Sequence, residues 1–266
     1  MQFDYYTELI LSSLAPLGIV AILACSAKLR TYSSSDVDYC RGVEGFHTKL
    51  ALLVSFITYP TSSATIFEVF HCSDFDDGSS FLAIDLSKRC DTPTHAGFIT
   101  YGSLMVVFIT GGTITLFAVL LYRSRHLINP VAKDSRTKMR LREANDSLRP
   151  IRFLFNDYNP SAWWCEVVEM IRRVIMVGGL RFCGAGGLRC GVGVLFALLS
   201  IFAYREIMPY TDNHTNSLAV AAQIVVYFVY VAAFIIETKP VRFSPIWNKK
   251  SFCVTPCMSL SFAVSL

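Results

Sequence analysis

The chain has 266 residues, of which 53% are hydrophobic and only 17% are charged, and its mean hydropathy is +0.46. A soluble domain carries about a quarter charged residues, so this composition excludes an ordinary soluble protein and is typical of a protein with several membrane-spanning helices. The net charge of +4 is modest, but the basic residues are spread very unevenly along the chain.

The first apolar run, residues 9–27, contains no acidic or basic residue and is long enough to cross a hydrocarbon core of about 30 Å. Residues 1–8 include two acidic residues and no Lys or Arg, whereas a signal peptide begins with basic residues. Lys28 and Arg30 follow the run directly. We therefore predict a first span within residues 1–27, with the N-terminus outside and the next loop inside.

Five more apolar segments follow, separated by polar loops. Their predicted ranges are 50–70, 96–122, 163–182, 190–204 and 218–236. Residues 50–122 thus hold spans two and three around an outer loop at 71–95, and residues 163–237 hold spans four to six. Residues 238–266 resemble a further, truncated span. The sequence predicts an all-α transmembrane bundle of about six helices, with a kink or a close helix approach at Gly111 and Gly112 in span three.

The basic residues orient this bundle. The loops at 28–49, 123–162 and 205–217 contain four, nine and one Lys or Arg residues, whereas those at 71–95 and 183–189 contain two and one. Positive residues favour cytoplasmic loops, so we predict that the first three loops lie inside. This orientation agrees with the one argued from the first span.

Two pairs of cysteines flank the predicted outer loops. Cys72 and Cys90 flank the first loop, and Cys183 and Cys190 flank the second. Disulfides form in oxidising compartments, and both loops are predicted to face one. We predict a Cys72–Cys90 disulfide. For Cys183 and Cys190, a disulfide and two unpaired thiols remain equal alternatives.

No catalytic or cofactor-binding motif is present: the chain has no Gly-rich phosphate loop, no nucleophile elbow and no metalloprotease His-Glu pattern. The acidic stretch 74–78 resembles the start of a calcium loop. The sixth position counted from Asp74, where such a loop needs Gly, is Ser79. We therefore expect no enzyme activity, no cofactor and no metal, and charge alone does not support nucleic-acid binding.

The charged patch at residues 163–173 opens the fourth predicted span. Trp163 and Trp164 suit the headgroup layer. Glu169 precedes Arg172 and Arg173 by three and four residues, so it can pair with either on one helix face. Ionisable groups inside a membrane usually face a bundle interior or a water-filled path. The predicted intramembrane polar or gating residues are Glu68, Glu166, Glu169, Arg172 and Arg173.

An alternative leaves the patch outside the hydrocarbon. If residues 163–173 form a helix lying flat in the interface, the chain has five spans instead of six. The loop at 205–217 would then move outside, and the sequon at Asn213 could be glycosylated. We expect the spanning version, because otherwise the glycine-rich turn near Gly184 would fall inside the membrane.

The lipid bilayer is the expected partner, and the basic loop suggests which lipids. Arg136, Lys138, Arg140 and Arg142 are predicted to contact anionic lipids of the inner leaflet. Plain positive-inside topology explains the same charges equally well. A homo-oligomer is compatible with the sequence.

Several stretches together resemble a known family. They lie at residues 65–72, 77–82, 85–90, 153–158, 163–173, 209–210 and 216–223. They are similar to the multi-pass C-terminal module of large cysteine-rich surface proteins of oomycetes, algae and other protists, a module similar to the transient receptor potential (TRP)-like channels. Such proteins often carry an ectodomain before this module, and we expect the natural protein to have one before Met1.

The resemblance implies a polytopic membrane protein that conducts cations or senses its environment. The alternative is a non-conducting membrane anchor and signalling scaffold of a larger surface receptor, with the basic loop as its cytoplasmic contact. A carrier is a third class, although no inverted internal repeat is evident.

Overall fold

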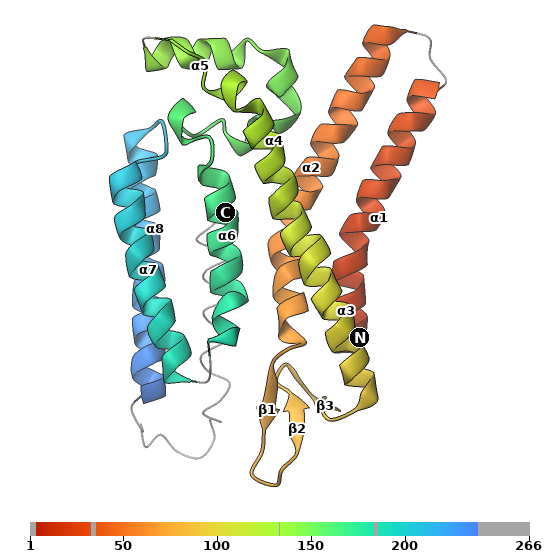
Figure 1. The fold of residues 1–266 in the computed structure, drawn as a ribbon, viewed down its shortest axis with the longest axis vertical. Helices are drawn as coiled ribbons and strands as arrows, with labels where there is room; N and C mark the ends of the chain where they lie inside the picture. The colour runs from red at the N-terminus through yellow and green to blue at the C-terminus, as the bar shows by residue number, and fades with distance from the viewer. Residues whose placement is uncertain (1–3, 33–35, 133, 184–185, 239–266) are drawn as a thin grey trace. The chain divides into compact units, whose positions relative to one another are not determined.

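The computed structural model describes residues 4–32, 36–132, 134–183 and 186–238, and these are mainly helical (Figure 1). The chain forms two compact units, one of residues 1–70 and 92–170 and one of residues 71–91 and 171–266. The predicted tail at 238–266 lies outside the described residues except for Thr238. The all-α class is confirmed, and among the described helices five are long and apolar enough to cross a membrane.

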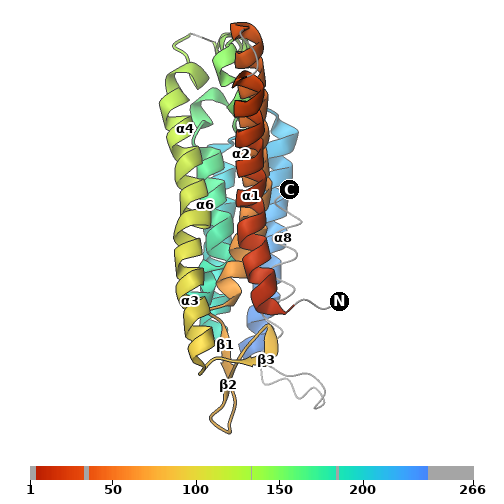
Figure 2. The same cartoon turned by 90° about the vertical axis from the view of Figure 1, so that its right-hand side faces the viewer.

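The first unit contains most of the helices. They are α1 (Tyr5–Tyr32), α2 (Val37–Glu68), α3 (Pro93–Met105), the π-helix η1 (Val106–Gly111), α4 (Gly112–Ile128), α5 (Ser135–Glu143), the 3₁₀ helices η2 (Asp146–Leu154) and η3 (Pro160–Ala162), and the start of α6 (Cys165–Val177). Helices α1 and α2 form an antiparallel pair, visible in Figures 1 and 2.

Polar side chains join the apolar helices of this unit. The Ser62 hydroxyl donates to the Ser12 carbonyl at 2.7 Å, and the Ser63 and Thr110 hydroxyls lie 2.7 Å apart. Ser13 bonds the Tyr101 hydroxyl at 2.6 Å. Lipid tails offer helices no hydrophobic drive to associate, so small polar residues with such bonds commonly hold membrane helices together.

The third predicted span is one long helical segment, Pro93–Ile128, that contains the π-helix. The π-turn ends at Gly111, where the sequence predicted a kink or a close approach. A π-turn inserts an extra residue into the helical repeat and commonly marks a bend. The close approach is found elsewhere, at Gly102, where a Cβ would lie 2.7 Å from Cγ1 of Val69.

The second unit contains a hairpin-like sheet and two long helices. Strands β1 (Cys72–Asp74), β2 (Ser80–Leu82) and β3 (Asp85–Arg89) form an antiparallel sheet in the order β1-β2-β3. The end of α6 leads through the 3₁₀ turn η4 (Gly179–Phe182) to α7 (Gly187–Ile207) and α8 (Asn213–Thr238). The sequence predicts a loop at residues 71–95, so this sheet is an addition to the predicted fold.

The α7–α8 pair is packed closely. A Cβ at Gly193 would lie 2.4 Å from Cδ1 of Tyr230, so glycine lets the tyrosine ring lie directly on the α7 backbone. The same ring belongs to a buried cluster, and the Tyr230 hydroxyl donates to the Met176 carbonyl at 3.2 Å. The buried members of the cluster are Met176, Leu180, Ala197, Val226 and Tyr230.

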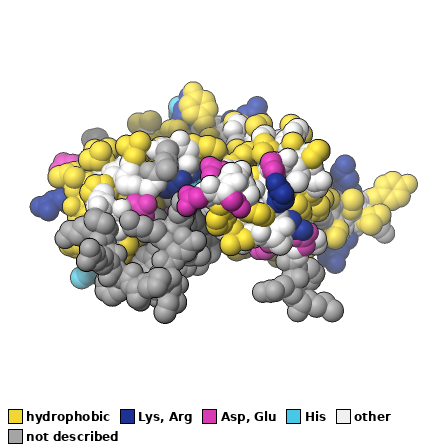
Figure 3. All heavy atoms as spheres, turned by 90° about the horizontal axis from the view of Figure 1, so that it is seen from below, with side chains coloured by type: hydrophobic (Ala, Val, Ile, Leu, Met, Phe, Trp, Pro, Cys, Tyr) yellow, Lys and Arg dark blue, Asp and Glu magenta, His cyan; other side chains and the backbone are white. Residues whose placement is uncertain are grey.

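The helices bury polar residues and expose apolar ones. In α8, Asn216 and Gln223 are 8% and 5% exposed, whereas Leu218 and Phe228 are 71% and 62% exposed. In α7, Ser200 is buried, and Leu195, Leu199 and Phe202 are exposed. The space-filling view in Figure 3 also shows many hydrophobic side chains at the surface. This distribution is the reverse of that expected in water and fits helices surrounded by lipid.

Candidate functional site

The segment between α4 and α6 folds around one arginine. Arg142, at the end of α5, is only 2% exposed. Its Nη1 atom donates to the carbonyls of Phe155 at 3.3 Å and Tyr158 at 3.0 Å, and its Nη2 atom donates to that of Asn156 at 3.1 Å. The guanidinium also lies over the Phe155 ring, 5.3 Å from its centre. Burial lowers the pKa of Arg142, but its planar donors have three carbonyl acceptors.

This folded segment is linked to α6 by one buried hydrogen bond. The Tyr158 hydroxyl donates to Oε2 of Glu166 at 2.7 Å, and both residues are buried. Glu166 lies in the first turn of α6, where the helix dipole favours a negative charge. Arg142 therefore fixes the backbone of Tyr158, and Tyr158 positions the carboxylate at the start of α6. We call Arg142, Tyr158 and Glu166 the inner linkage.

The 3₁₀ helix η2 anchors the segment on the long helices. Its buried residues Leu148, Ile151 and Leu154 recur every third position, which places them on one face of a three-residue turn. Next to them, the Phe153 ring lies 5.7 Å from that of Phe56 in α2 and 6.5 Å from that of Phe117 in α4. The segment is thus a packed part of the first unit.

The predicted lipid-contact residues separate into two groups. Arg136 and Arg140 are exposed on α5, as a lipid contact requires, and Lys138 donates to Oδ1 of Asn129 at 3.1 Å. The assignment of Arg142 to this set was wrong, because its guanidinium is enclosed by its own loop. Sequence spacing alone could not separate it from its neighbours.

The predicted intramembrane residues do not meet at one point. Glu68 is the last residue of α2, next to the sheet, and is 7% exposed. Glu166 lies in the first turn of α6 and bonds Tyr158, which follows η2, and η2 lies beside the first half of α2. Glu68 and Glu166 therefore lie toward opposite ends of the first unit (Figure 1).

Helix α6 carries its carboxylates on the buried side. Glu166 and Glu169 are 7% and 5% exposed, whereas Val168 and Ile171 are 51% and 42% exposed. Arg172 and Arg173 are half-buried, and Nη1 of Arg172 lies 3.1 Å from Sδ of Met176. The pairing of Glu169 with either arginine stays a prediction.

Aromatic residues surround the start of α6. The Trp163 ring lies 6.3 Å from the Tyr122 ring near the end of α4. The Arg125 guanidinium lies 3.9 Å from the centre of the same tyrosine ring, in cation–π contact. Tyr122 is 57% exposed and Trp164 is 36% exposed. Such a group of amphipathic rings beside a basic residue is typical of a membrane–water interface.

The depth of α6 can be judged within the second unit. Met176 packs on Tyr230, which lies eight residues, or about 12 Å at 1.5 Å per residue, before the end of α8 at Thr238. Alone, α6 has 13 residues and is too short to cross the hydrocarbon. With η4 added, the helical path approaches the required length. Its packing on the middle of two candidate spans supports the membrane-embedded alternative for the patch.

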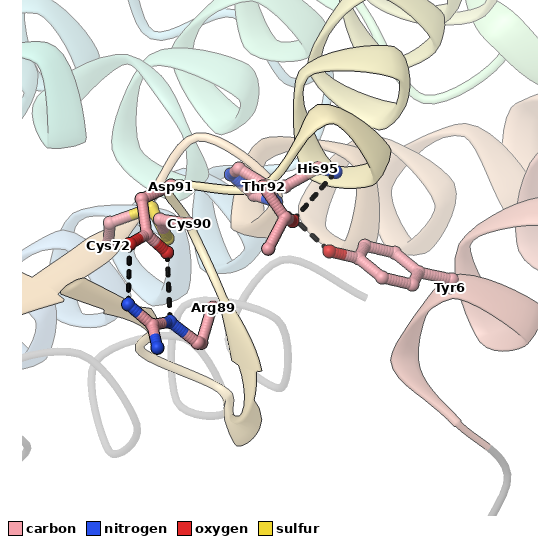
Figure 4. Close-up of a disulfide and its surroundings, with 7 residues drawn as sticks. All are labelled: Tyr6, Cys72, Arg89, Cys90, Asp91, Thr92 and His95. Atoms are coloured by element: carbon pink, nitrogen blue, oxygen red, sulfur yellow. Dashed lines mark hydrogen bonds and ion pairs between the residues drawn. A yellow bond between two sulfur atoms is a disulfide. The ribbon is translucent and has the colours of Figure 1, made fainter. Parts of the chain in front are cut away.

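The two cysteine pairs have different outcomes. Cys72 and Cys90 form the predicted disulfide, which joins β1 to the residue that follows β3, beside the Arg89–Asp91 ion pair (Figure 4). Cys183 has a free thiol, so it does not pair with Cys190. Cys190 is disulfide-bonded, so the alternative of two unpaired thiols is not found either.

No direct sign of the role of Tyr158 is visible in the sequence. The three-residue spacing of Leu148, Ile151 and Leu154 is the signal that could have shown a folded segment there.

No protein-family model, no curated protein and no solved structure matches this chain.

Proposed function

We propose that the chain is a TRP-like membrane module that conducts cations or senses its environment, with the buried carboxylates of α6 as its polar element. One observation carries the proposal: Glu166 and Glu169 face the protein interior on a helix whose outer face is apolar. An ionisable group at membrane depth is costly, so a chain that keeps two on one face generally uses them.

The inner linkage supplies a means of control. The Tyr158 hydroxyl donates a hydrogen bond to the Glu166 carboxylate, and Arg142 bonds the backbone carbonyl of the same tyrosine. A movement of the segment between α4 and α6 changes the environment of Glu166, and with it the electric field at the start of α6. Such a coupled pair suits a gate that responds to events in the basic segment.

The test is cation flux through liposomes containing the purified full-length chain. We expect flux above that of empty vesicles, and we expect Glu169→Gln to reduce it several-fold because the buried charge is lost. Glu44→Gln, which neutralises an exposed carboxylate on α2, is the matched control and should leave the flux unchanged. Absence of flux above empty vesicles would remove the conducting form of the proposal.

Tyr158→Phe tests the control element separately. The phenylalanine keeps the ring and removes the donor to Glu166, so we expect the flux at a fixed gradient to change while the protein remains folded. Tyr32→Phe, at a tyrosine that is 94% exposed, is the control. Equal flux in both variants would show that the linkage does not regulate conduction.

A non-conducting anchor and signalling scaffold is the second candidate, and the exposed basic side chains of Arg136 and Arg140 on a folded segment favour it. Deleting the whole segment between α4 and α6 would not separate the two candidate functions. Since η2 packs on α2 and α4, the deletion would also disturb the helices themselves. The double variant Arg136→Gln/Arg140→Gln leaves the fold intact. A scaffold predicts loss of partner recruitment with no flux in any variant, and a conductor predicts flux that persists.

A further inference from the structure

An open groove lies between the first part of α2 and η2, within the first unit, and has a volume of about 1040 Å³. Ligand pockets in proteins usually have volumes of about 300–1,000 Å³, so this one can hold a group much larger than a single inorganic ion. No local sequence pattern indicates this groove, because its two walls come from segments about a hundred residues apart.

Three cationic side chains line the groove: Arg41 and Lys49 from α2, and Arg149 from η2. Asp38 and Asp146 are also in its walls, so the lining is net positive. Arg41 pairs with Asp38 at 3.8 Å, but both side chains are more than three-quarters exposed, and such a surface pair is weak. Among the described residues, Lys49 and Arg149 have no hydrogen-bond or ion-pair partner.

The floor of the groove is helix backbone. Gly42 and Gly45 lie three residues apart and therefore share a face of α2. A Cβ added at either would meet no atom within 4 Å, so the space is open above both. Glycine inside a helix is unfavourable by about 0.5–1 kcal/mol relative to alanine. Neither glycine is required by packing within the protein, but both let a ligand approach the helix closely.

The groove lies where α2 leaves the apolar region. Its apolar run begins at Leu50, and the residues before it include Asp38, Arg41, Glu44 and Lys49. Phe46, also in the lining, is 65% exposed. Lys49 therefore marks the edge of the hydrocarbon, and Arg41 lies about 12 Å farther out along the helix. Lipid headgroups extend about 5–8 Å beyond the hydrocarbon core on each side, so Lys49 lies at the start of the headgroup layer. Arg41 lies at the depth of a larger headgroup that projects beyond this layer.

We propose that this groove binds the phosphorylated headgroup of an anionic membrane lipid. Lys49 and Arg149 approach from opposite walls and offer charge-assisted hydrogen bonds to phosphate oxygens. The volume suits a headgroup with a ring and more than one phosphate. The glycine floor accommodates the ring, and Phe46 contacts the lipid stem. The proposal concerns residues other than Arg136 and Arg140 and does not depend on cation conduction.

Binding of short-chain lipids to the full-length chain in detergent micelles, measured by native mass spectrometry, tests the proposal. The probes are dioctanoyl phosphatidylinositol bisphosphate, dioctanoyl phosphatidylserine, dioctanoyl phosphatidylcholine and inorganic phosphate. We expect the bisphosphate lipid to bind at least about tenfold more tightly than phosphatidylserine, because it presents additional phosphate oxygens to the same cations. Equal affinity for all three lipids would overturn the proposal.

Variants of the groove identify the site. Lys49→Gln/Arg149→Gln should weaken binding of the bisphosphate lipid about tenfold or more by removing both unpaired cations. Gly45→Leu should weaken it similarly by filling the floor, and Gly45→Ala provides a smaller obstruction that also favours the helix. Melting temperatures close to that of the unaltered protein confirm that each variant is folded.

The matched control is Lys28→Gln/Arg30→Gln, which removes one exposed lysine and one exposed arginine of α1 outside the groove and should change the affinity less than twofold. An equal loss in this control would mean general surface attraction and would overturn the assigned site. Unchanged binding in the groove variants would do the same. Competition by inorganic phosphate at concentrations similar to the lipid would show that the groove takes free phosphate, which would overturn the lipid as its occupant.

Discussion

Arg142 shows how one residue can organise the turn between two short helices, here the residues between η2 and η3. Its guanidinium donates to the carbonyls of Phe155, Asn156 and Tyr158, and it does so at 2% exposure. Buried backbone carbonyls need partners, and a fixed fork of donors can supply several at once. The cationic charge is thus used inside the fold, in a loop whose other arginines face outward.

This role predicts that Arg142→Lys is not a conservative change. A lysine ammonium cannot bond the carbonyls of Phe155, Asn156 and Tyr158 with the same geometry, and it is more strongly hydrated. We expect the free energy of unfolding to fall by about 2–3 kcal/mol, measured as a lower melting temperature of the purified protein. Arg136→Lys, on the exposed side of the same helix, is the control and should melt like the unaltered protein. A melting temperature for Arg142→Lys within one degree of the control would refute the role.

At the scale of elements, glycine and tyrosine determine how α7 meets α8. The Tyr230 ring occupies the place where a side chain at residue 193 would lie, and its hydroxyl bonds the Met176 carbonyl. One contact therefore joins three helical elements of the second unit. Also in α8, Gln223 is buried, and its Oε1 atom has no hydrogen-bond partner among the described residues.

The surroundings of Gly193 and Gly18 predict opposite effects on stability when each glycine is changed to alanine. Gly193→Ala would place a Cβ 2.4 Å from the Tyr230 ring and should destabilise the protein by about 1–3 kcal/mol. Gly18→Ala in α1 meets nothing within 4 Å and should stabilise the protein slightly, since alanine favours a helix. Melting temperatures of both variants provide the measurement. Combined with Tyr230→Ala, Gly193→Ala should become nearly neutral, and equal destabilisation in both backgrounds would contradict the assigned contact.

The elements also show what the sequence could and could not predict. Long runs without charge, such as residues 9–27 and 96–122, are local properties, so the spans they predict agree with α1 and the α3–α4 segment. The Cys72–Cys90 pair was also visible from its position. The sheet between these cysteines has strands of only three to five residues, too short for a clear alternation. The burial of Arg142 and the groove beside Arg149 depend on distant segments, which no local pattern contains.

At the scale of the whole molecule, the surface distribution of residues indicates the solvent. Five helices combine sufficient length with an apolar composition, and they bury hydroxyl and amide groups while exposing leucine and phenylalanine. A protein in water would aggregate through such a surface. In lipid the same surface is the favourable one, and the buried polar groups hold the helices together. The described part of the chain is therefore that of an integral membrane protein.

The number of times that the chain crosses the membrane depends on α6. Because Met176 and Leu180 pack on the central parts of α7 and α8, we expect α6 with η4 to cross the membrane. The turn between α7 and α8 then lies on the same side as α5. If α6 lay flat at the interface, that turn would lie on the side of the β-sheet instead.

Labelling of intact cells with a membrane-impermeant maleimide distinguishes the two topologies. His214→Cys introduces a thiol in the exposed first turn of α8, Asp76→Cys one at the exposed tip of the sheet, and Arg136→Cys one on exposed α5. We expect reaction above the native background only at residue 76 in intact cells, and at all three positions after permeabilisation. Reaction at residue 214 in intact cells would place the turn between α7 and α8 outside, and α6 would then lie at the interface. Water would surround Glu166 and Glu169 there, so no conduction path would be required to explain these charges.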